Sequence, residues 1–170
     1  MLPLNIRPEQ PADLPAIRAL VTVAFGQAAE ADLVDRLRAA RALAHSLLAG
    51  QNGALVGHIA LSPVSVQGAF MPGVLGLAPL AVDPQHQRRG IGAALVEAAL
   101  ASGRAEAAKL VVVLGEPAYY RRFGFRPAAG LGLTCPWPET GEAFQALVLA
   151  PPAPRGLVRY HRAFEVMATP

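Results

Sequence analysis

The strongest constraint on the fold is a pair of apolar stretches joined by one helical segment. The first stretch is Gly73–Val82, GVLGLAPLAV, and the second is Lys109–Gly115, KLVVVLG. Continuous apolar runs of this length are typical of strands that are buried on both faces. A helix of about 12 residues, starting at Ile91, connects them. Because such crossovers join parallel neighbours, we expect Val74–Val82 and Leu110–Leu114 to form adjacent parallel strands.

The loop before this helix carries two arginines and two glycines in the sequence DPQHQRRGIG. The first N–H groups of a helix have no partner within the helix, and the macrodipole makes that end positive, so it binds phosphate. Gly90 and Gly92 lack the Cβ atoms that would block a close approach, and Arg88 and Arg89 add positive charge. The segment therefore predicts a phosphate site, with a diphosphate as the expected ligand.

Three phosphate-binding motifs can be compared with this loop. A P-loop ends in Gly-Lys-Ser or Gly-Lys-Thr, and neither triplet occurs in the chain. In the dinucleotide fingerprint the glycine-rich segment directly follows a strand, and a third glycine is needed at the position that Leu95 occupies here. The third pattern, Gln/Arg-x-x-Gly-x-Gly/Ala, fits Gln87–Gly92 at every fixed position. It is the acetyl-CoA signature of the GNAT superfamily of N-acetyltransferases, which the chain resembles here.

A second stretch strengthens this resemblance. GNAT proteins have a tyrosine four positions before a Gly-Phe pair after their fifth strand, and Tyr120 holds that place before Gly124. The fuller stretch, GEPAYYRRFGF, resembles one bacterial branch of acetyltransferases with a Gly-acid-Pro-Ala-Tyr-Tyr-x-Arg-Phe-Gly-Phe motif. The ending VRYHRAF, Val158–Phe164, resembles the same branch. The resemblance spans nearly the whole chain and concerns fold and cofactor more than substrate.

The resemblance implies an α/β (α+β) GNAT fold in a single domain over residues 1–170. Its mixed central sheet would have about six to seven strands and about four flanking helices. The fourth and fifth strands would diverge at their carboxyl ends and open a slot. The implied activity is direct transfer of an acetyl group from acetyl-CoA to a primary amine of an unidentified acceptor, which is a small molecule or a protein. A non-catalytic acetyl-CoA-binding sensor or regulatory module is the alternative.

The resemblance also implies roles for individual residues. Backbone groups of the fourth strand would pair with the pantetheine arm, and N–H groups from Arg88 to Ala93 would hold the pyrophosphate. Tyr120 would protonate the departing thiolate, since a phenol with a pKa of about 10 is mostly protonated at neutral pH. Tyr119 is the alternative candidate for this proton donor. The expected cofactor-binding residues are Leu80, Ala81, Val82, Gln87, Arg88, Arg89, Gly90, Ile91, Gly92 and Ala93.

The general base has three candidates in the sequence. Many GNAT enzymes keep a glutamate on the fourth or fifth strand, but neither apolar stretch contains an acid. Glu116 is the first candidate, and its structural alternative is a carboxylate at a helix start. Glu30, beside the usual acceptor cleft, and His58, within an expected strand, are the others. A chain of water molecules would also serve for an amine of low pKa.

The remaining elements follow from hydrophobic periodicity and turn residues. Asn52-Gly53 favours the tight turn of a hairpin. Pro8 and Pro11 are expected to end the first strand. The other expected elements are a strand over Leu2–Arg7, helices from Asp13 to Phe25, from near Ala29, from Ile91 to about Gly103 and over Pro117–Phe123, and strands within Ala143–Ala150 and Gly156–Phe164.

Composition and charge narrow the class of protein further. With 170 residues, 53% of them apolar, the chain can bury the core of one ordinary domain. No run of about 18 apolar residues predicts a membrane span, and the amino-terminal sequence is not that of a secretory signal. We therefore expect a cytoplasmic protein that is a monomer or a homodimer.

Metal and nucleic-acid binding are not expected. Cys135 is the single cysteine, so the chain forms neither an intrachain disulfide nor a cysteine-based zinc site. The histidines do not show ligand spacing. The formal charge is only +3, and the arginines are scattered apart from Arg88-Arg89 and Arg121-Arg122. A nucleic-acid-associated protein, the third class considered, would rest on charge alone.

Overall fold

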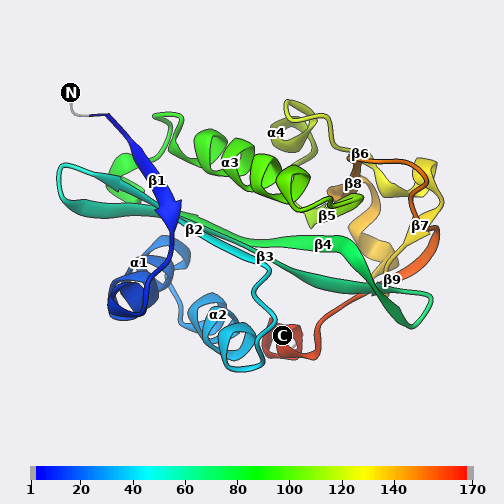
Figure 1. Ribbon diagram of the computed structural model, residues 1–170, viewed down its shortest axis with the longest axis horizontal. Coiled ribbons are helices and arrows are strands. Elements are labelled where there is room, and N and C mark those ends of the chain that lie inside the picture. The colour runs from blue at the N-terminus through cyan, green and yellow to red at the C-terminus, as the bar shows by residue number, and fades with distance from the viewer. Residues whose placement is uncertain (1–2, 168–170) are drawn as a thin grey trace.

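A twisted mixed β-sheet forms the centre of the protein (Figure 1). The computed structural model describes residues 3–167. Within that range nine strands are ordered β1-β2-β3-β4-β5-β8-β6, while β9 pairs with β3 and with β7. The strands are β1 (Asn5–Pro8), β2 (His45–Gln51), β3 (Ala54–Val66), β4 (Ala69–Val82), β5 (Leu110–Leu114), β6 (Arg126–Pro127), β7 (Leu133–Thr134), β8 (Phe144–Val148) and β9 (Gly156–Tyr160).

Helices cover both faces of the sheet (Figure 1). The four α-helices of the described residues are α1 (Leu14–Phe25), α2 (Ala29–Ala39), α3 (Ile91–Ala105) and α4 (Pro117–Arg121). Leu47 in β2 packs in one buried cluster with residues of α3, whereas its neighbour Leu48 packs with residues of α1 and α2. This alternation follows from the two-residue period of a strand. It produces a core layer on each face.

The architecture confirms the predicted α/β class with a mixed sheet and four helices. The sheet has nine strands, more than the six to seven expected, because it includes two strands of only two residues, β6 and β7. Short 3₁₀ helices lie between several of the other elements and at the end of the described residues, and they were not predicted from the sequence. They are η1 (Pro11–Asp13), η2 (Pro84–His86), η3 (Ala128–Leu131), η4 (Pro138–Ala143) and η5 (Arg162–Met167).

The predicted parallel pair is present at the centre of the sheet. Strands β4 and β5 pair in parallel from Val74 opposite Leu110 to Leu77 opposite Val113, with α3 as the crossover. The pairing with β5 ends at Leu77, but β4 continues to Val82. An irregularity in the β3–β4 ladder lies at this point and includes Pro79, which has no N–H to donate. The two strands therefore diverge at their carboxyl ends, as expected.

Two hairpin turns explain the long strands β3 and β4. Asn52 and Gly53 both have positive φ, 54° and 78°, as a two-residue hairpin turn requires. Gln67 and Gly68 repeat this geometry with φ of 52° and 77°. This second turn was not predicted, and because of it β4 starts at Ala69, four residues before the expected start.

Other element boundaries differ from the sequence reading in modest ways. Strand β1 ends at Pro8, as expected, and includes the proline as its last residue because an edge strand tolerates a missing N–H donor. Met1 and Leu2 lie outside the described residues. Helix α4 ends at Arg121, and the last expected strand is divided into β9 and η5. None of the helices within residues 3–167 is long and apolar enough to span a bilayer.

Candidate active site

The carboxyl end of β4 presents free backbone groups to the gap beside β5. The N–H of Asp83 donates to the carbonyl of Val56 at 2.9 Å, which fixes the phase of the β3–β4 ladder. Because hydrogen-bonded and non-hydrogen-bonded pairs alternate, Ala81 bonds to β3, whereas Leu80 and Val82 direct their N–H and C=O groups into the gap. Of the three predicted strand residues, Leu80 and Val82 are thus placed to bind an extended ligand. The side chain of Ala81 is buried on the α1 face.

The loop from β4 to α3 turns back over this end of the strand. Gly90 has a φ of 81° at the N-cap of α3, a conformation that favours glycine. The Nε2 amide of Gln87 donates to the carbonyl of Val82 at 3.2 Å, so the first residue of the predicted motif ties the loop to the strand. Arg88 also has a positive φ, 59°. The loop therefore places the open helix start next to the divergent strand.

A cavity of about 510 Å³ lies over the start of α3. Its lining includes eight of the ten predicted cofactor-binding residues; Ala81 and Arg89 do not line it. Tyr119 and Arg122 complete the lining, and neither was predicted to bind the cofactor. The guanidinium of Arg122 lies 4.5 Å from the centroid of the Tyr119 ring. The double arginine at 121–122 was the only sequence feature that pointed to this added cation.

Gly92 provides space for a tyrosine as well as for a ligand. A Cβ atom built on Gly92 would lie 2.8 Å from the hydroxyl oxygen of Tyr119. Any side chain at this position would therefore push against Tyr119. Burial raises the pKa of Tyr119, so its hydroxyl stays protonated at neutral pH.

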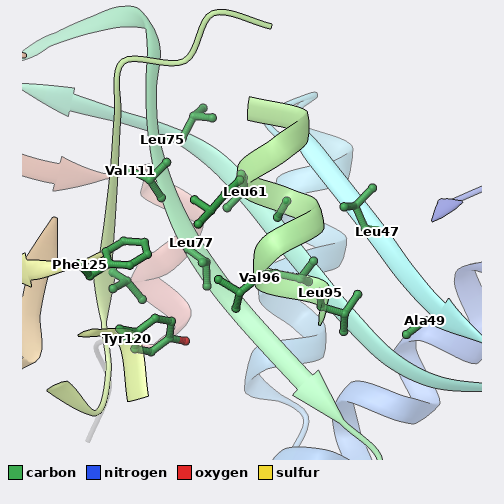
Figure 2. Close-up of a cluster of buried hydrophobic side chains, with 14 of the residues drawn as sticks. Leu47, Ala49, Leu61, Leu75, Leu77, Leu95, Val96, Val111, Tyr120 and Phe125 are labelled. Carbon is green, nitrogen blue, oxygen red and sulfur yellow. The ribbon is translucent and has the colours of Figure 1, made fainter. Parts of the chain in front are cut away.

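Tyr120 lies at the margin of the core cluster, beside Phe125 (Figure 2). Its ring is 8% exposed and packs edge-on against Phe125 with centroids 5.6 Å apart. A Cβ at Gly115 would come within 3 Å of this ring, so only glycine leaves room for it. Burial raises the pKa of Tyr120 to about 12. The phenol therefore remains a proton donor through neutral and mildly alkaline pH.

A second cavity, of about 590 Å³, lies on the other side of Tyr119 and Leu80, which line both cavities. Tyr120 lines this second cavity. The remaining lining residues come from α1, α2, β4, β5, η4 with the residue before it, β9 and η5: Phe25, Glu30, Leu33, Leu77, Ala78, Pro79, Leu114, Trp137, Glu139, Thr140, Tyr160, Phe164 and Met167. The two cavities meet at the divergence of β4 from β5.

Glu30 is the buried carboxylate of the second cavity. Its side chain is 7% exposed, and the Nε2 amide of Gln27 donates to its two oxygens at 3.0 and 3.1 Å. Gly26, with a φ of 70°, ends α1 and allows the short turn that brings α2 back against the cavity. Glu139 is the other acid in the lining, but it is exposed. Of the three candidates for the general base, Glu30 alone shares a cavity with Tyr120.

Glu116 and His58 lie elsewhere. Glu116 is exposed, and its carboxylate accepts from the N–H of Ala118 at 3.4 Å as the N-cap of α4. His58 is fully buried, 2.9 Å from the hydroxyl of Ser46, and burial lowers its pKa to about 4. Neither residue lines the two cavities. Within residues 3–167 no group of three or more His, Cys, Asp or Glu side chains is arranged to hold a metal ion.

Comparison with protein families gives a match over most of the chain. The model of the acetyltransferase (GNAT) domain matches residues 5–128. This range includes β1 to β6, the loop at the start of α3, and Tyr119 and Tyr120. It does not include β7 to β9, nor the aromatic residues Trp137, Tyr160 and Phe164 that line the second cavity.

Individual relatives match over nearly the full chain. The uncharacterized N-acetyltransferase YhbS of Escherichia coli K12 is 44% identical over 163 residues, which cover 94% of this chain and 97% of that protein. The crystal structure of E. coli YhbS in complex with CoA has a TM-score of 0.92 and 42% identity, covering 97% of this chain and 93% of that one. A GNAT family acetyltransferase from Brucella melitensis in complex with acetyl-CoA has a TM-score of 0.82 and 40% identity, with 95% and 97% covered.

Proposed function

The chain belongs to the GNAT acetyltransferase family and is an acetyltransferase, and we propose that it transfers the acetyl group of acetyl-CoA directly to a primary amine. The observation that carries this proposal is the meeting of two cavities at the divergence of β4 from β5. One has the features of a phosphate site, and the other contains a buried carboxylate and a buried phenol. Two bound reactants would meet at Tyr119 and Leu80.

The first cavity fits acetyl-CoA on three grounds. The positive φ of Gly90 presents the open N–H groups of α3, and Gly92 leaves no side chain in front of them. Arg88 and Arg122 supply positive charge for the pyrophosphate. The outward N–H and C=O groups of Leu80 and the outward N–H of Val82 match the amides of the pantetheine arm, while the C=O of Val82 accepts from Gln87. Two relatives of similar fold bind CoA and acetyl-CoA.

The transfer step needs one proton donor and one proton acceptor. The amine nitrogen attacks the thioester carbonyl, its bond to carbon forms, and the carbon–sulfur bond breaks. Tyr120 donates its hydroxyl proton to the departing thiolate, and the proton lost by the amine passes to Glu30. Solvent then restores the proton of Tyr120 and takes that of Glu30. Glu116, the first candidate from sequence, faces solvent and acts as an N-cap.

The alternative of a non-catalytic binding module drew its support from the absence of an acid on the two central strands. Glu30 supplies a carboxylate to the cavity from α2, so that support is lost. A turnover assay tests the proposal directly, by following release of the CoA thiol with a panel of primary amines. Amine-dependent release is expected, and its absence for every amine, in protein that binds acetyl-CoA, would refute amine transfer.

Further properties belong to this proposal. A single domain over residues 1–170 is supported by one sheet that joins the first strand to the last. A cytoplasmic location and a monomeric or homodimeric state stay predictions from the sequence.

A further inference from the structure

The second cavity has a wall of three aromatic rings. Tyr160 lies in the middle, with its ring centroid 6.1 Å from that of Trp137 and 4.8 Å from that of Phe164. Gly76 makes room for this wall, since a Cβ there would lie 2.8 Å from the Tyr160 ring. Leucines from α2, β4 and β5 continue the apolar surface. Such a surface gains free energy by covering an apolar ligand body.

The charges in the cavity have one sign. Glu30 and Glu139 are the acids in its lining, and none of the described lining residues is an arginine, lysine or histidine. Glu30 is buried and has a neutral hydrogen-bond partner, Gln27, rather than a cationic one. A buried carboxylate without a cation is unfavourable, so a ligand ammonium would stabilise it. A carboxylate on the ligand would have no cation to pair with.

The size of the cavity also bears on the ligand. Its volume of about 590 Å³ lies within the range of about 300–1,000 Å³ typical of small-molecule sites. Among the described residues that line this cavity, Glu30 is the only buried acid. A second ammonium group on the ligand would therefore lose its hydration against the aromatic wall without gaining a buried carboxylate as a partner.

From these observations we infer that the acceptor is a small apolar monoamine, in which a single primary amine is attached to an aromatic or aliphatic body without a carboxylate. Glu30 binds the ammonium and the wall of Trp137, Tyr160 and Phe164 covers the body. This inference rests on the proposed amine transfer and names its substrate class.

The test compares an apolar monoamine with an amino acid and with a polyamine. 2-Phenylethylamine is the apolar monoamine, phenylalanine adds a carboxylate to it, and spermidine is a polyamine. We expect kcat/KM for 2-phenylethylamine to exceed that for phenylalanine by at least about 100-fold, because the added carboxylate is buried without a partner. It should also exceed the value for spermidine. A preference for phenylalanine or spermidine would overturn the inference.

Two substitutions of glutamate by glutamine, one inside the cavity and one outside it, provide the matched comparison. Glu30→Gln should lower kcat/KM for 2-phenylethylamine by about 10- to 100-fold, the effect of losing one charged hydrogen bond and one proton acceptor. Glu142→Gln, an exposed acid of η4 that lines neither cavity, should change it less than about twofold. Equal effects of the two substitutions would contradict a role for the buried carboxylate. Folding of Glu30→Gln is checked by its unchanged affinity for acetyl-CoA.

Binding measurements separate this inference from the proposed function. Calorimetric titration of each amine into the enzyme–CoA complex reports selectivity without turnover. Tighter binding of 2-phenylethylamine than of phenylalanine, without CoA release from acetyl-CoA, would support the monoamine site and refute amine transfer. Turnover of amines without this preference would refute the substrate class and leave amine transfer standing.

Discussion

The two cavities of the site are built in different ways. Most of the first cavity, where we propose that the cofactor binds, comes from one continuous segment, the end of β4, its loop and the first turn of α3. The second cavity, the proposed acceptor site, shares β4 and α4 with the first and takes further side chains from six elements spread along the chain, α1, α2, β5, η4, β9 and η5. We therefore propose that backbone conformation determines what binds in the first cavity, and that the choice of side chains determines it in the second. Substitutions in the two regions should therefore affect different measured quantities.

The largest effect is expected at Tyr120, between the two regions. Tyr120→Phe removes the proton donor but keeps the packing against Phe125, so kcat should fall by roughly 10²–10⁴-fold while acetyl-CoA affinity stays unchanged. Steady-state kinetics and calorimetry measure the two quantities. Tyr119→Phe is the control and should change kcat little. If the control loses turnover and Tyr120→Phe retains it, the proton donor is Tyr119.

A histidine outside both cavities should affect stability and leave the chemistry intact. Burial lowers the pKa of His58 to about 4, against about 6.5 in an unfolded chain. The folded state therefore resists protonation. The contribution of His58 to the free energy of unfolding is full above pH 6.5, and about 3 kcal/mol of it is lost as the pH falls from 6.5 to 4.

Replacement of the histidine isolates this effect. His58→Gln should remove that part of the pH dependence, as seen in urea unfolding at pH 7 and pH 4.5. Its kcat at pH 7 should match that of the wild-type protein, because His58 lines neither cavity. A large loss of kcat in folded His58→Gln would show that the surroundings of His58 in β3 are coupled to the site.

Gly92 tests the region made by backbone. A valine there would meet the Tyr119 hydroxyl and cover the start of α3, so acetyl-CoA affinity should fall at least about tenfold, or 1.4 kcal/mol. Calorimetry measures this loss. The double variant Gly92→Val/Tyr119→Phe relieves the contact with the hydroxyl and should recover part of the affinity. No recovery would mean that the valine acts only by blocking the ligand.

The smallest effect is expected at an exposed arginine of the cofactor cavity. Arg122→Gln should weaken acetyl-CoA binding by up to about fivefold at low salt, in line with the modest strength of exposed charge pairs. The loss should shrink as salt screens the charge. Arg121→Gln is the matched control, since Arg121 is next to Arg122 in the chain but lines neither cavity. Equal losses in both variants would indicate a general effect of net charge.

The contrast between a cavity built from one continuous segment and a cavity built from scattered elements also decides how much of the protein could be predicted from sequence. The parallel strands, the crossover helix and the loop from Gln87 are consecutive, so periodicity and glycine spacing indicated them correctly. Arg122 joins the loop only through folding, and its sequence neighbours do not specify that contact. The Gln67-Gly68 turn was missed because Pro72 and Gly73 interrupt the apolar residues that follow it, so that the next strand was expected to begin only at Gly73.

The acceptor cavity could not be assembled from sequence. Trp137 and Phe164 lie on 3₁₀ or irregular segments that lack a periodic pattern, so their positions depend on packing, of Trp137 against Tyr160 of β9 and of Phe164 against α2. The roles of Glu30 and Glu116 differ for a similar reason. Both stand at the start of a helix, and only the tertiary structure shows that one faces a cavity and the other faces solvent.

The divergence of β4 from β5 places an edge strand in the middle of a sheet. Such edges are templates for pairing with other extended chains and promote aggregation. Here the exposed length is short, Pro79 contributes no donor and Gln87 covers the carbonyl of Val82, three features that limit self-association. An extended ligand that bonds to Leu80 and Val82 would act as the missing strand. Acetyl-CoA should then raise the melting temperature and slow heat-induced aggregation, because binding stabilises the folded state and pairs with the exposed part of β4.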